Sequence, residues 1–287
     1  MSLAFEFIRL MRPQRWYKNL LVFAAAFFSM NIFNPSSLLL SIYGFVILCL
    51  ISSANYVIND LFDWKRDRMN PEKKKRPLAA GTISRREGVS FAVLLYAIGF
   101  YLSYSLNLWL FALVILFAAL TTSYTFYFKN IAFADVIVIS TNFVLRAIAG
   151  VILIGVDLSP WFFLSIFSFS FFLVFGKRYG DLMLMGKGVK DYKPVMKDYD
   201  ADILRGLIQV FLSCLIILYG LYAFFTSQQV LLFLYPIILY IFFRYYYLVS
   251  RGSRCSRDPE KVFITDKPIL LSSVVFVVLL FILMYLA

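Results

Sequence analysis

The sequence Asn59-Asp60-Leu61-Phe62-Asp63-Trp64-Lys65-Arg66-Asp67 stands at the end of a long apolar run, Leu38 to Ile58. If the helix of that run continues, Asp60, Asp63 and Asp67 lie at positions i, i+3 and i+7, on one helix face. Carboxylates on one face repel one another unless a cation lies between them. Hard oxygen ligands of this kind suit Mg²⁺, which bridges a few carboxylates to substrate phosphates. We therefore predict a magnesium site at these three residues.

The alternative interpretation is a solvated, charged helix end, which is the usual structure of a charge run. The position of the acidic stretch argues against this interpretation. Ionisable groups at the point where a membrane helix leaves the bilayer are candidates for a functional site. A basic segment, Pro71 to Gly81, follows directly and includes Lys73 and Arg76. These two cations are candidates for holding substrate phosphates, since Lys acts as a point charge and Arg as a fork.

The composition indicates a membrane protein. The chain is 62% hydrophobic and 15% charged, whereas a soluble domain carries about a quarter charged residues. Apolar runs of bilayer length recur along the chain. The nine runs are Asn19–Phe33, Leu38–Ile58, Val89–Ser105, Leu108–Tyr127, Ala132–Ile154, Trp161–Phe175, Ile203–Phe225, Val230–Val249 and Pro268–Ala287. The sequence thus predicts an all-α, polytopic membrane protein with nine transmembrane helices.

The distribution of the net charge of +12 predicts the topology. Lys and Arg gather before the first run, between the second and third, after the sixth and before the ninth. The alternate loops, at 34–37, 106–107, 155–159 and 226–229, contain none. Basic residues mark the cytoplasmic side. We expect a cytoplasmic N-terminus and cytoplasmic active-site loops, an external C-terminus, and no nucleic-acid partner.

Cysteine and histidine usage narrows the chemistry. Cys49 and Cys214 fall within apolar runs and Cys255 in a cytoplasmic loop, so no disulfide framework is expected. The sequence contains no His. This excludes haem ligation by His and acid–base or zinc chemistry that depends on imidazole.

Two long loops occupy corresponding positions, after the second run and after the sixth. This spacing predicts a single catalytic domain over residues 1–287, with halves of about 1–128 and 129–249 related by duplication and a final helix at 268–287. The second loop begins with Lys177, Arg178 and, one turn after Lys177, Asp181. Its Lys excess fits the inside-positive bias. That bias does not explain the pairing of Asp181 with Lys177. By its charge the loop favours phosphate binding over a second cation site.

Ionisable residues inside an apolar run are costly and mark functional sites. Asp135 and Arg146 lie eleven residues apart, about 20° in azimuth but about 16 Å along a helix. They share a face and cannot pair, so each must meet another helix, water or a ligand. Lys18 precedes the first run, where both a snorkelling role and a substrate role are open.

These residues resemble a known family. The pattern Asn59-Asp60-x-x-Asp63-x-x-x-Asp67, followed by Asn70-Pro71-x-Lys73-x-x-Arg76-Pro77, is similar to the first aspartate motif of the UbiA-type intramembrane prenyltransferases. The closest similarity is to the decaprenyl-phosphate phosphoribosyltransferase branch. It rests on further segments: Arg12-Pro13-x-x-Trp16-x-Lys18-Asn19, Tyr124…Lys129…Asp135…Leu145–Gly150, Lys177-Arg178-x-x-Asp181 and Pro259-Glu260-Lys261…Asp266. The branch usually has Glu where this chain has Asp181.

The resemblance implies a nine-helix bundle with a central cavity open to the cytoplasm, in a bacterial inner membrane. It implies Mg²⁺-dependent transfer of 5-phosphoribosyl from phosphoribosyl diphosphate to a polyprenyl phosphate, with the product supplying arabinose for the cell envelope. Asp60, Asp63 and Asp67 would be catalytic and hold the metal. The substrate-binding candidates are Lys18, Asn59, Lys73, Arg76, Tyr124, Lys129, Asp135, Arg146, Lys177, Arg178 and Asp181.

Two alternatives stay open. Prenyl transfer from a prenyl diphosphate to an aromatic acceptor would use a second Asp-x-x-x-Asp motif, and Lys177-Arg178-x-x-Asp181 stands in its place. A transporter of a phosphorylated lipid or metabolite would use Asp135 and Arg146 along a pathway. That function would give the carboxylates of Asp60, Asp63 and Asp67 no role. The sequence leaves the prenyl chain length and the oligomeric state open.

Overall fold

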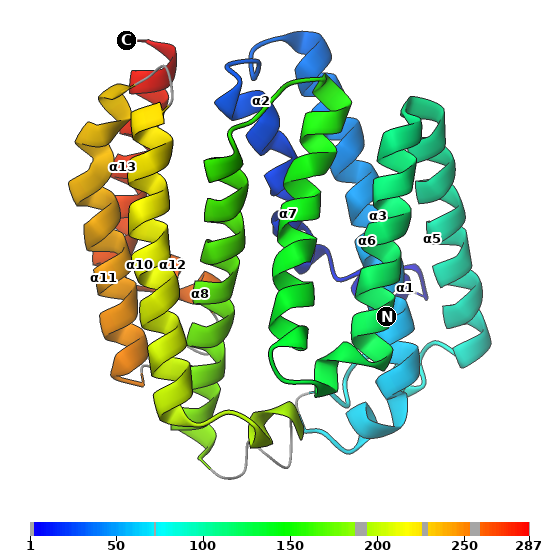
Figure 1. The fold of residues 1–287 in the computed structure, drawn as a ribbon. Helices are drawn as coiled ribbons and strands as arrows, with labels where there is room; N and C mark the ends of the chain where they lie inside the picture. The colour runs from blue at the N-terminus through cyan, green and yellow to red at the C-terminus, as the bar shows by residue number, and fades with distance from the viewer. Residues whose placement is uncertain (1–2, 72, 187–193, 226–228, 253–258, 287) are drawn as a thin grey trace. The chain divides into compact units, whose positions relative to one another are not determined.

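The computed structural model describes residues 3–71, 73–186, 194–225, 229–252 and 259–286. All regular structure in those residues is helical (Figure 1). The α-helices are α1 (Leu3–Met11), α2 (Ala24–Phe28), α3 (Pro35–Arg68), α4 (Pro77–Ala80), α5 (Arg85–Leu106), α6 (Leu108–Phe126), α7 (Ala134–Ile154), α8 (Pro160–Met185), α10 (Ala201–Phe225), α11 (Tyr235–Ser250), α12 (Pro259–Thr265) and α13 (Lys267–Tyr285). Shorter 3₁₀ segments are η1 (Pro13–Phe23), η2 (Phe128–Asn130), η3 (Pro194–Lys197) and η4 (Gln229–Leu234).

The chain divides into two compact units. Unit 1 comprises Met1–Tyr127 and Asn142–Asp157, and unit 2 comprises Phe128–Thr141 and Leu158–Ala287. Helix α7 therefore contributes its first residues to unit 2 and the rest to unit 1. A duplication that relates the two halves of the chain stays a prediction.

The protein is a multi-pass membrane protein. Eight helical stretches in the described part of the chain are long and apolar enough to cross a bilayer. They correspond to the second to ninth predicted runs. The first predicted run, Asn19–Phe33, is instead built from the end of η1 and the short helix α2. The predicted count of nine transmembrane helices is therefore not confirmed.

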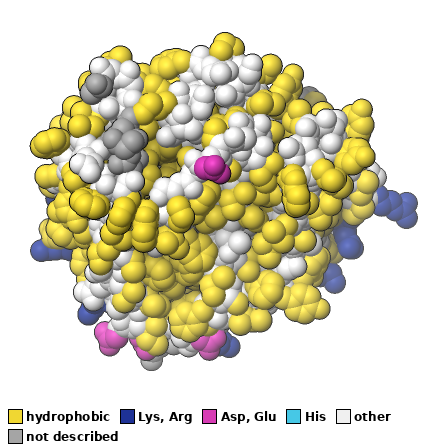
Figure 2. Space-filling model, turned by 45° about the horizontal axis from the view of Figure 1, so that its top comes forward, with side chains coloured by type: hydrophobic (Ala, Val, Ile, Leu, Met, Phe, Trp, Pro, Cys, Tyr) yellow, Lys and Arg dark blue, Asp and Glu magenta, His cyan; other side chains and the backbone are white. Residues whose placement is uncertain are grey.

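The outward surface supports this assignment. Large hydrophobic side chains such as Tyr101, Trp109 and Phe233 are 70% or more exposed. Hydrophobic side chains cover most of the face seen in Figure 2, and Lys and Arg lie at its margins. Contiguous exposed apolar surface of this extent is typical of contact with lipid.

Polar caps start the long helices of unit 1. Asn34 accepts hydrogen bonds from the backbone N–H groups of Ser36 and Ser37 at the start of α3. Ser84 and Glu87 form a capping box at the start of α5, and Asn107 caps α6. Each cap satisfies backbone donors that the first helical turn leaves without partners. These residues fix where each span begins.

Helix α3 is the central element of unit 1 and packs against η1, α5 and α6. Its 34 residues extend about 51 Å, whereas the hydrocarbon core of a bilayer is about 30 Å thick. The last turns of α3 therefore lie beyond the hydrocarbon and carry Asp60, Asp63 and Asp67. The predicted continuation of the helix through this acidic stretch is confirmed.

Close backbone packing joins α7 to η1. A Cβ atom on Gly150 would lie 2.1 Å from the carbonyl oxygen of Val22, so only glycine permits this contact. In unit 2 the core is aromatic: the rings of Phe171 and Phe211 stack with centroids 4.4 Å apart, joining α8 to α10. Buried aromatic pairs of this kind add to the stability that their burial supplies.

Candidate active site

The acidic face of α3 is formed by two buried carboxylates. Asp60 and Asp67 are each 2% exposed, and Asp63 is half-buried. Nη1 of Arg76 lies 3.0 Å from Oδ1 of Asp60 and 2.6 Å from Oδ2 of Asp67. Both carboxylates therefore point to the same place, as their spacing predicts. The cation between them in this structure is a guanidinium.

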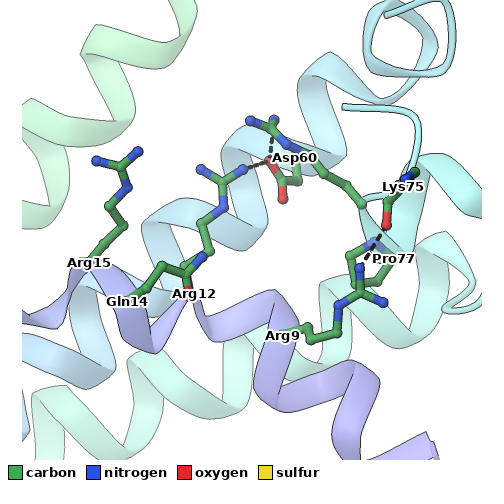
Figure 3. Close-up of a pocket in the computed structure, with 8 residues that line it drawn as sticks. Arg9, Arg12, Gln14, Arg15, Asp60, Lys75 and Pro77 are labelled. Carbon is green, nitrogen blue, oxygen red and sulfur yellow. Dashed lines mark hydrogen bonds and ion pairs between the residues drawn. The ribbon is translucent and has the colours of Figure 1, made fainter. Parts of the chain in front are cut away.

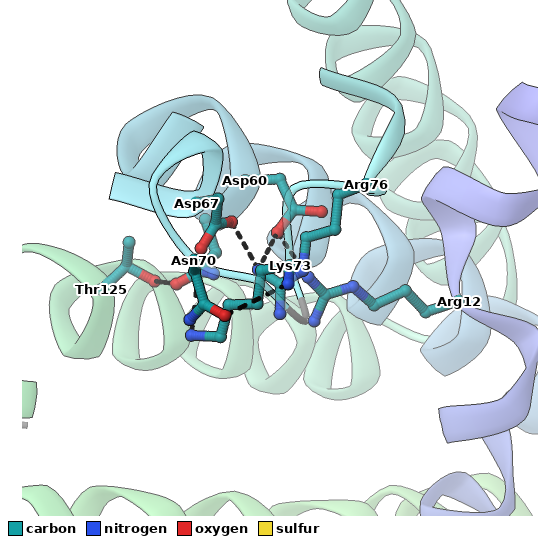
Figure 4. Close-up of polar contacts among 8 residues, drawn as sticks. Arg12, Asp60, Asp67, Asn70, Lys73, Arg76 and Thr125 are labelled. Carbon is teal, nitrogen blue, oxygen red and sulfur yellow. Dashed lines mark hydrogen bonds and ion pairs between the residues drawn. The ribbon is translucent and has the colours of Figure 1, made fainter. Parts of the chain in front are cut away.

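A second arginine completes the cluster (Figure 4). Arg12 lies immediately before η1, and its Nη2 donates a hydrogen bond to the carboxylate of Asp60. Nζ of Lys73 lies 3.9 Å from Oδ1 of Asp67. Three cations thus converge on two buried carboxylates. Charge-assisted hydrogen bonds of this type are stronger than neutral ones, and they offset the cost of burying the acids.

The electrostatic environment of Lys73 bears on its use as a phosphate ligand. Burial and, next, the charge of Arg76 lower the pKa of Lys73, while the carboxylates of Asp67 and Asp63 oppose that shift. The backbone N–H of Lys73 also donates to Oδ1 of Asn70 at 3.3 Å, which fixes the turn after α3. An arriving phosphate would favour the charged form of Lys73.

The loop after α3 is held from two sides. Nε of Arg68 donates to the carbonyl oxygen of Ala79 at 3.0 Å, and Nη2 of Arg9 donates to that of Lys75 at 3.0 Å. Arg9 is itself paired with Glu6 at 2.8 Å within α1. These contacts fix α1 against the loop that carries Arg76.

A pocket of about 410 Å³ opens beside this cluster (Figure 3). Its lining residues are Arg9, Arg12, Gln14, Arg15, Asp60, Lys75, Arg76 and Pro77. Five of the eight are cationic and only one is acidic. A pocket of this composition suits a ligand with several phosphate groups.

The residues of the cluster fit a divalent cation in part. The carboxylates of Asp60 and Asp67 already share one cation, the guanidinium of Arg76. Carboxylate oxygens are also the ligands that Mg²⁺ prefers. Within the described residues, however, no three acidic, Cys or His side chains are grouped as metal ligands. A metal set formed by Asp60, Asp63 and Asp67 therefore stays a prediction.

Other predicted residues of unit 1 surround this face. Oδ1 of Asn59 accepts from the hydroxyl of Thr125 at 3.5 Å, which joins α3 to α6. Tyr124 is half-buried on α6. Nζ of Lys18 lies 5.6 Å from the ring centroid of Phe143. Binding roles for Asn59, Tyr124 and Lys18 stay predictions.

Arg146 meets another element, as its position in α7 requires. Its side chain is buried, and its Nε donates to Oδ1 of Asn19 at 2.8 Å. Nη1 donates to the carbonyl oxygen of Asn142 at 2.6 Å. The guanidinium also lies 4.8 Å from the ring centroid of Phe117. Its partners are thus polar and aromatic.

Unit 2 holds the remaining predicted residues. Asp135 is fully buried at the start of α7, and Arg178 of α8 donates to its Oδ2. The hydroxyl of Tyr199 donates to Oδ1 of Asp135 at 3.2 Å and accepts from the backbone N–H of Phe133 at 2.8 Å. Burial raises the pKa of Tyr199 to about 12, so the phenol keeps its proton at neutral pH. Asp135 already neutralises Arg178, so phosphate binding by Arg178 would have to compete with this pair.

Lys177 and Lys129 are half-buried, and Asp181 is buried on α8. Their substrate roles stay predictions. The basic residues at 187–193 lie outside the described residues, as do the side chains of Pro259, Glu260 and Lys261.

Several residues that line the pocket or contact predicted site residues were not themselves predicted as site residues. Arg9, Arg15 and Lys75 line the pocket, Arg12 pairs with Asp60, and Tyr199 holds Asp135. For Arg12 and Arg15 a local signal exists, because Arg12, Arg15 and Lys18 recur every third residue before an apolar run. Tyr199 lies 64 residues from Asp135 and offers no such signal.

Comparison with known proteins identifies the family. The model of the UbiA prenyltransferase family matches residues 20–265. The chain therefore belongs to the UbiA prenyltransferase family and is a transferase.

Individual relatives refine this placement. The chain is 32% identical to a decaprenyl-phosphate phosphoribosyltransferase of Mycolicibacterium smegmatis, over 76% of this chain and 70% of that protein. It is also 32% identical to the decaprenyl-phosphate phosphoribosyltransferase of Corynebacterium glutamicum, over 79% of this chain and 70% of that one. Its fold is similar to that of a UbiA homolog from Archaeoglobus fulgidus bound to GPP and Mg²⁺. That comparison has a TM-score of 0.75 at 20% identity and covers 97% and 99% of the two chains.

Proposed function

We propose that this protein transfers a 5-phosphoribosyl group from phosphoribosyl diphosphate to a polyprenyl phosphate and releases diphosphate. The observation that carries the proposal is the pocket beside Asp60, with five cations and one carboxylate. A donor with a diphosphate and a 5-phosphate presents more negative charge than a prenyl diphosphate. The names of the two bacterial relatives support the same reaction.

The donor site lies in unit 1. Arg9, Arg12, Arg15, Lys75 and Arg76 would hold the phosphates. Because Arg12 and Arg76 now bind Asp60 and Asp67, donor phosphates compete for the same guanidinium groups. Donor binding therefore makes the carboxylates available to a metal ion. Asp60 and Asp67, with Asp63 beside them, would hold Mg²⁺, which when bound neutralises the leaving diphosphate.

The reaction needs no protein nucleophile. An oxygen of the acceptor phosphate forms a bond to C1 of the ribose as the bond from C1 to the diphosphate oxygen breaks. The electron pair of that bond leaves with the diphosphate, and the ribosyl centre is oxocarbenium-like in the transition state. The acceptor phosphate is already anionic, so no general base is required. The arginines stabilise the charge that develops on the diphosphate.

Substrate choice tests the proposal against its alternatives. The purified protein with Mg²⁺ is offered two labelled pairs: phosphoribosyl diphosphate with decaprenyl phosphate, and GPP with 4-hydroxybenzoate as an aromatic acceptor. We expect a lipid-linked label from the first pair alone. A prenylated aromatic product would favour the aromatic-prenyltransferase alternative. No product from either pair, with a protein shown by thermal unfolding to be folded, would favour a transporter.

A further inference from the structure

Three cations converge on the indole ring of Trp64 near the end of α3. Nζ of Lys65 lies 5.8 Å from the ring centroid, and Cζ of Arg68 lies 5.6 Å from it. The third cation comes from α5, where Cζ of Arg85 lies 5.3 Å from the same centroid. The three cationic side chains are exposed, and Trp64 is half-buried. Two helices thus build one basic aromatic group, which we call the Trp64 cluster.

The Trp64 cluster is distinct from the acidic face of α3. Arg68 and Lys65 lie about 80° and 140° around the helix from Asp60. On the acidic face the cations have carboxylate partners, since the guanidinium groups of Arg12 and Arg76 both pair with Asp60. The pocket beside Asp60 is lined by no residue of the Trp64 cluster.

The cations of the Trp64 cluster have no carboxylate partner in the described part of the chain. None of the ion pairs found there includes one of them. The acid nearest to Arg85 in sequence is Glu87, and its Oε2 accepts from the backbone N–H of Ser84 at 2.7 Å in the capping box of α5. Like charges that converge repel one another, and an anion among them replaces that repulsion with attraction.

The apolar runs determine the depth of the cluster in the membrane. On α3 the run ends at Ile58, and Trp64 lies about 9 Å further along the axis. On α5 the run begins at Val89, and Arg85 precedes it by about 6 Å. The polar layer on each side of the hydrocarbon is about 5–8 Å thick, and the Cβ atoms of α3 tilt back toward the hydrocarbon. The cluster therefore lies at the level of the lipid head groups.

Exposed apolar side chains continue from the cluster toward the hydrocarbon. Val89 and Val93 follow Arg85 on the same side of α5, at i+4 and i+8, and are 49% and 60% exposed. On α3, Phe62 precedes Lys65 by three residues and is 52% exposed. Apolar surface of this kind suits lipid tails. Tryptophan and cations at the adjacent level are typical of the membrane interface.

We propose that the Trp64 cluster binds the head group of an anionic phospholipid. The phosphate lies among two guanidinium forks and one ammonium group, which are the side chains that bind phosphate best. The acyl chains lie along the exposed apolar side chains of α3 and α5. Basic residues next to a membrane span attract anionic lipids in the same way. This site does not depend on the proposed reaction, because it shares no residue with the donor pocket.

Lipid titration tests the site. Phosphatidylglycerol or phosphatidylcholine is added to the purified protein in neutral detergent, and the rise in unfolding temperature gives an apparent dissociation constant for each lipid. We expect phosphatidylglycerol to bind at least 10-fold more tightly than phosphatidylcholine. The double variant Lys65→Gln, Arg85→Gln should bind phosphatidylglycerol at least 10-fold more weakly than the wild-type protein. Unfolding without added lipid checks that the variant is folded.

A matched variant separates the cluster from net charge. The double variant Arg66→Gln, Arg86→Gln removes two exposed cations, each next in sequence to one of the first pair. Its net charge therefore equals that of Lys65→Gln, Arg85→Gln. The cations over the Trp64 ring in the described structure do not include Arg66 or Arg86. We expect its affinity for phosphatidylglycerol to stay within 2-fold of the wild-type value.

Each result supports or overturns the site. Equal affinity for the two lipids, or equal losses in the two double variants, would overturn it, because a specific cluster would then not be needed. Displacement of phosphatidylglycerol by an equal concentration of sn-glycerol 3-phosphate would overturn lipid as the source of the phosphate. If Lys65→Gln, Arg85→Gln does not fold, the two single variants decide the question, and each should lose at least 3-fold in affinity. Unchanged affinity in both folded single variants would also overturn the site.

Discussion

Nη1 of Arg76 lies 2.6 Å from Oδ2 of Asp67, and the same nitrogen lies 3.0 Å from Asp60. One guanidinium therefore joins the loop after α3 to two buried carboxylates of that helix. The contact stabilises the ligand-free arrangement of the cluster. It also makes Arg76 a group for which donor phosphate and protein carboxylates compete.

The first prediction concerns this pair. Arg76→Gln and Asp67→Asn should each lower stability by about 1–3 kcal/mol, because each removes a charge-assisted hydrogen bond from a buried or half-buried group. The double variant should cost less than the sum, with a coupling energy of about 1 kcal/mol or more. Thermal unfolding in detergent of the wild-type protein, the two single variants and the double variant measures this coupling energy. Additive losses would show that the contact contributes nothing to the folded state.

The second prediction separates Asp63 from its neighbours. Asp63 is half-buried, and its charge acts on Lys73. Asp63→Asn should keep the unfolding temperature within about 2 °C, since Asn has nearly the size and shape of Asp and the side chain is only half-buried. If the residue helps to hold the metal, turnover should fall at least 100-fold, and the midpoint of Mg²⁺ activation should rise. Turnover within 3-fold of the wild-type value would remove Asp63 from the metal set.

The sequence predicted the part of the site that is local. The spacing of Asp60 and Asp67 was enough to place both on one face, because helical period alone determines it. The identity of the cation between them was not predictable, since Arg76 reaches back from a loop. The run Asn19–Phe33 has the composition of a span, but η1 follows a three-residue period set by contacts with α3 and α7. Hydropathy does not report such contacts.

In unit 2 as well, a contact between residues far apart in the chain could not be predicted from the sequence. The sequence required Asp135 to meet another helix or a ligand, and Arg178 meets that requirement from α8. A separation of 43 residues between the two hides the pair from any local pattern. Arg178 was predicted to hold phosphate from its position in a basic loop. Its burial beside Asp135 is a tertiary property.

The third prediction follows from that pair. Asp135→Asn should destabilise the protein by about 3–5 kcal/mol, because it leaves the buried Arg178 without its carboxylate. Combining Arg178→Met with Asp135→Asn should recover part of the lost stability, since no buried charge is then left without its partner. Lys177→Ala, one residue away and half-buried, is the matched control and should keep the unfolding temperature. Equal effects of Asp135→Asn and Lys177→Ala on unfolding would contradict a structural ion pair.

The fourth prediction concerns pH. Burial and Arg76 lower the pKa of Lys73 below 10.5, so the folded protein holds this proton less tightly than the unfolded chain. Between the lowered pKa and 10.5 the unfolded chain binds more protons, so the Lys73 contribution to stability rises with pH across that window. Bound phosphate raises the pKa again, and donor binding at these pH values should take up a proton. Calorimetry in two buffers of different ionisation enthalpy measures the uptake.

The variant Lys73→Arg supplies the control for that measurement, because a guanidinium stays charged throughout the window. Its binding of phosphoribosyl diphosphate should show no proton uptake beyond that of the ligand itself. Equal uptake by Lys73→Arg and the wild-type protein would assign the proton to another group.

The position of an isotope label tests the central claim most directly. Decaprenyl phosphate carrying ¹⁸O in its phosphate is incubated with the protein, Mg²⁺ and phosphoribosyl diphosphate, and both products are analysed by mass spectrometry. The account predicts a lipid heavier by one phosphoribosyl group that retains all of the ¹⁸O, and a released diphosphate that contains none. A diphosphate that carries ¹⁸O, or a lipid that gains no phosphoribosyl group, would contradict it.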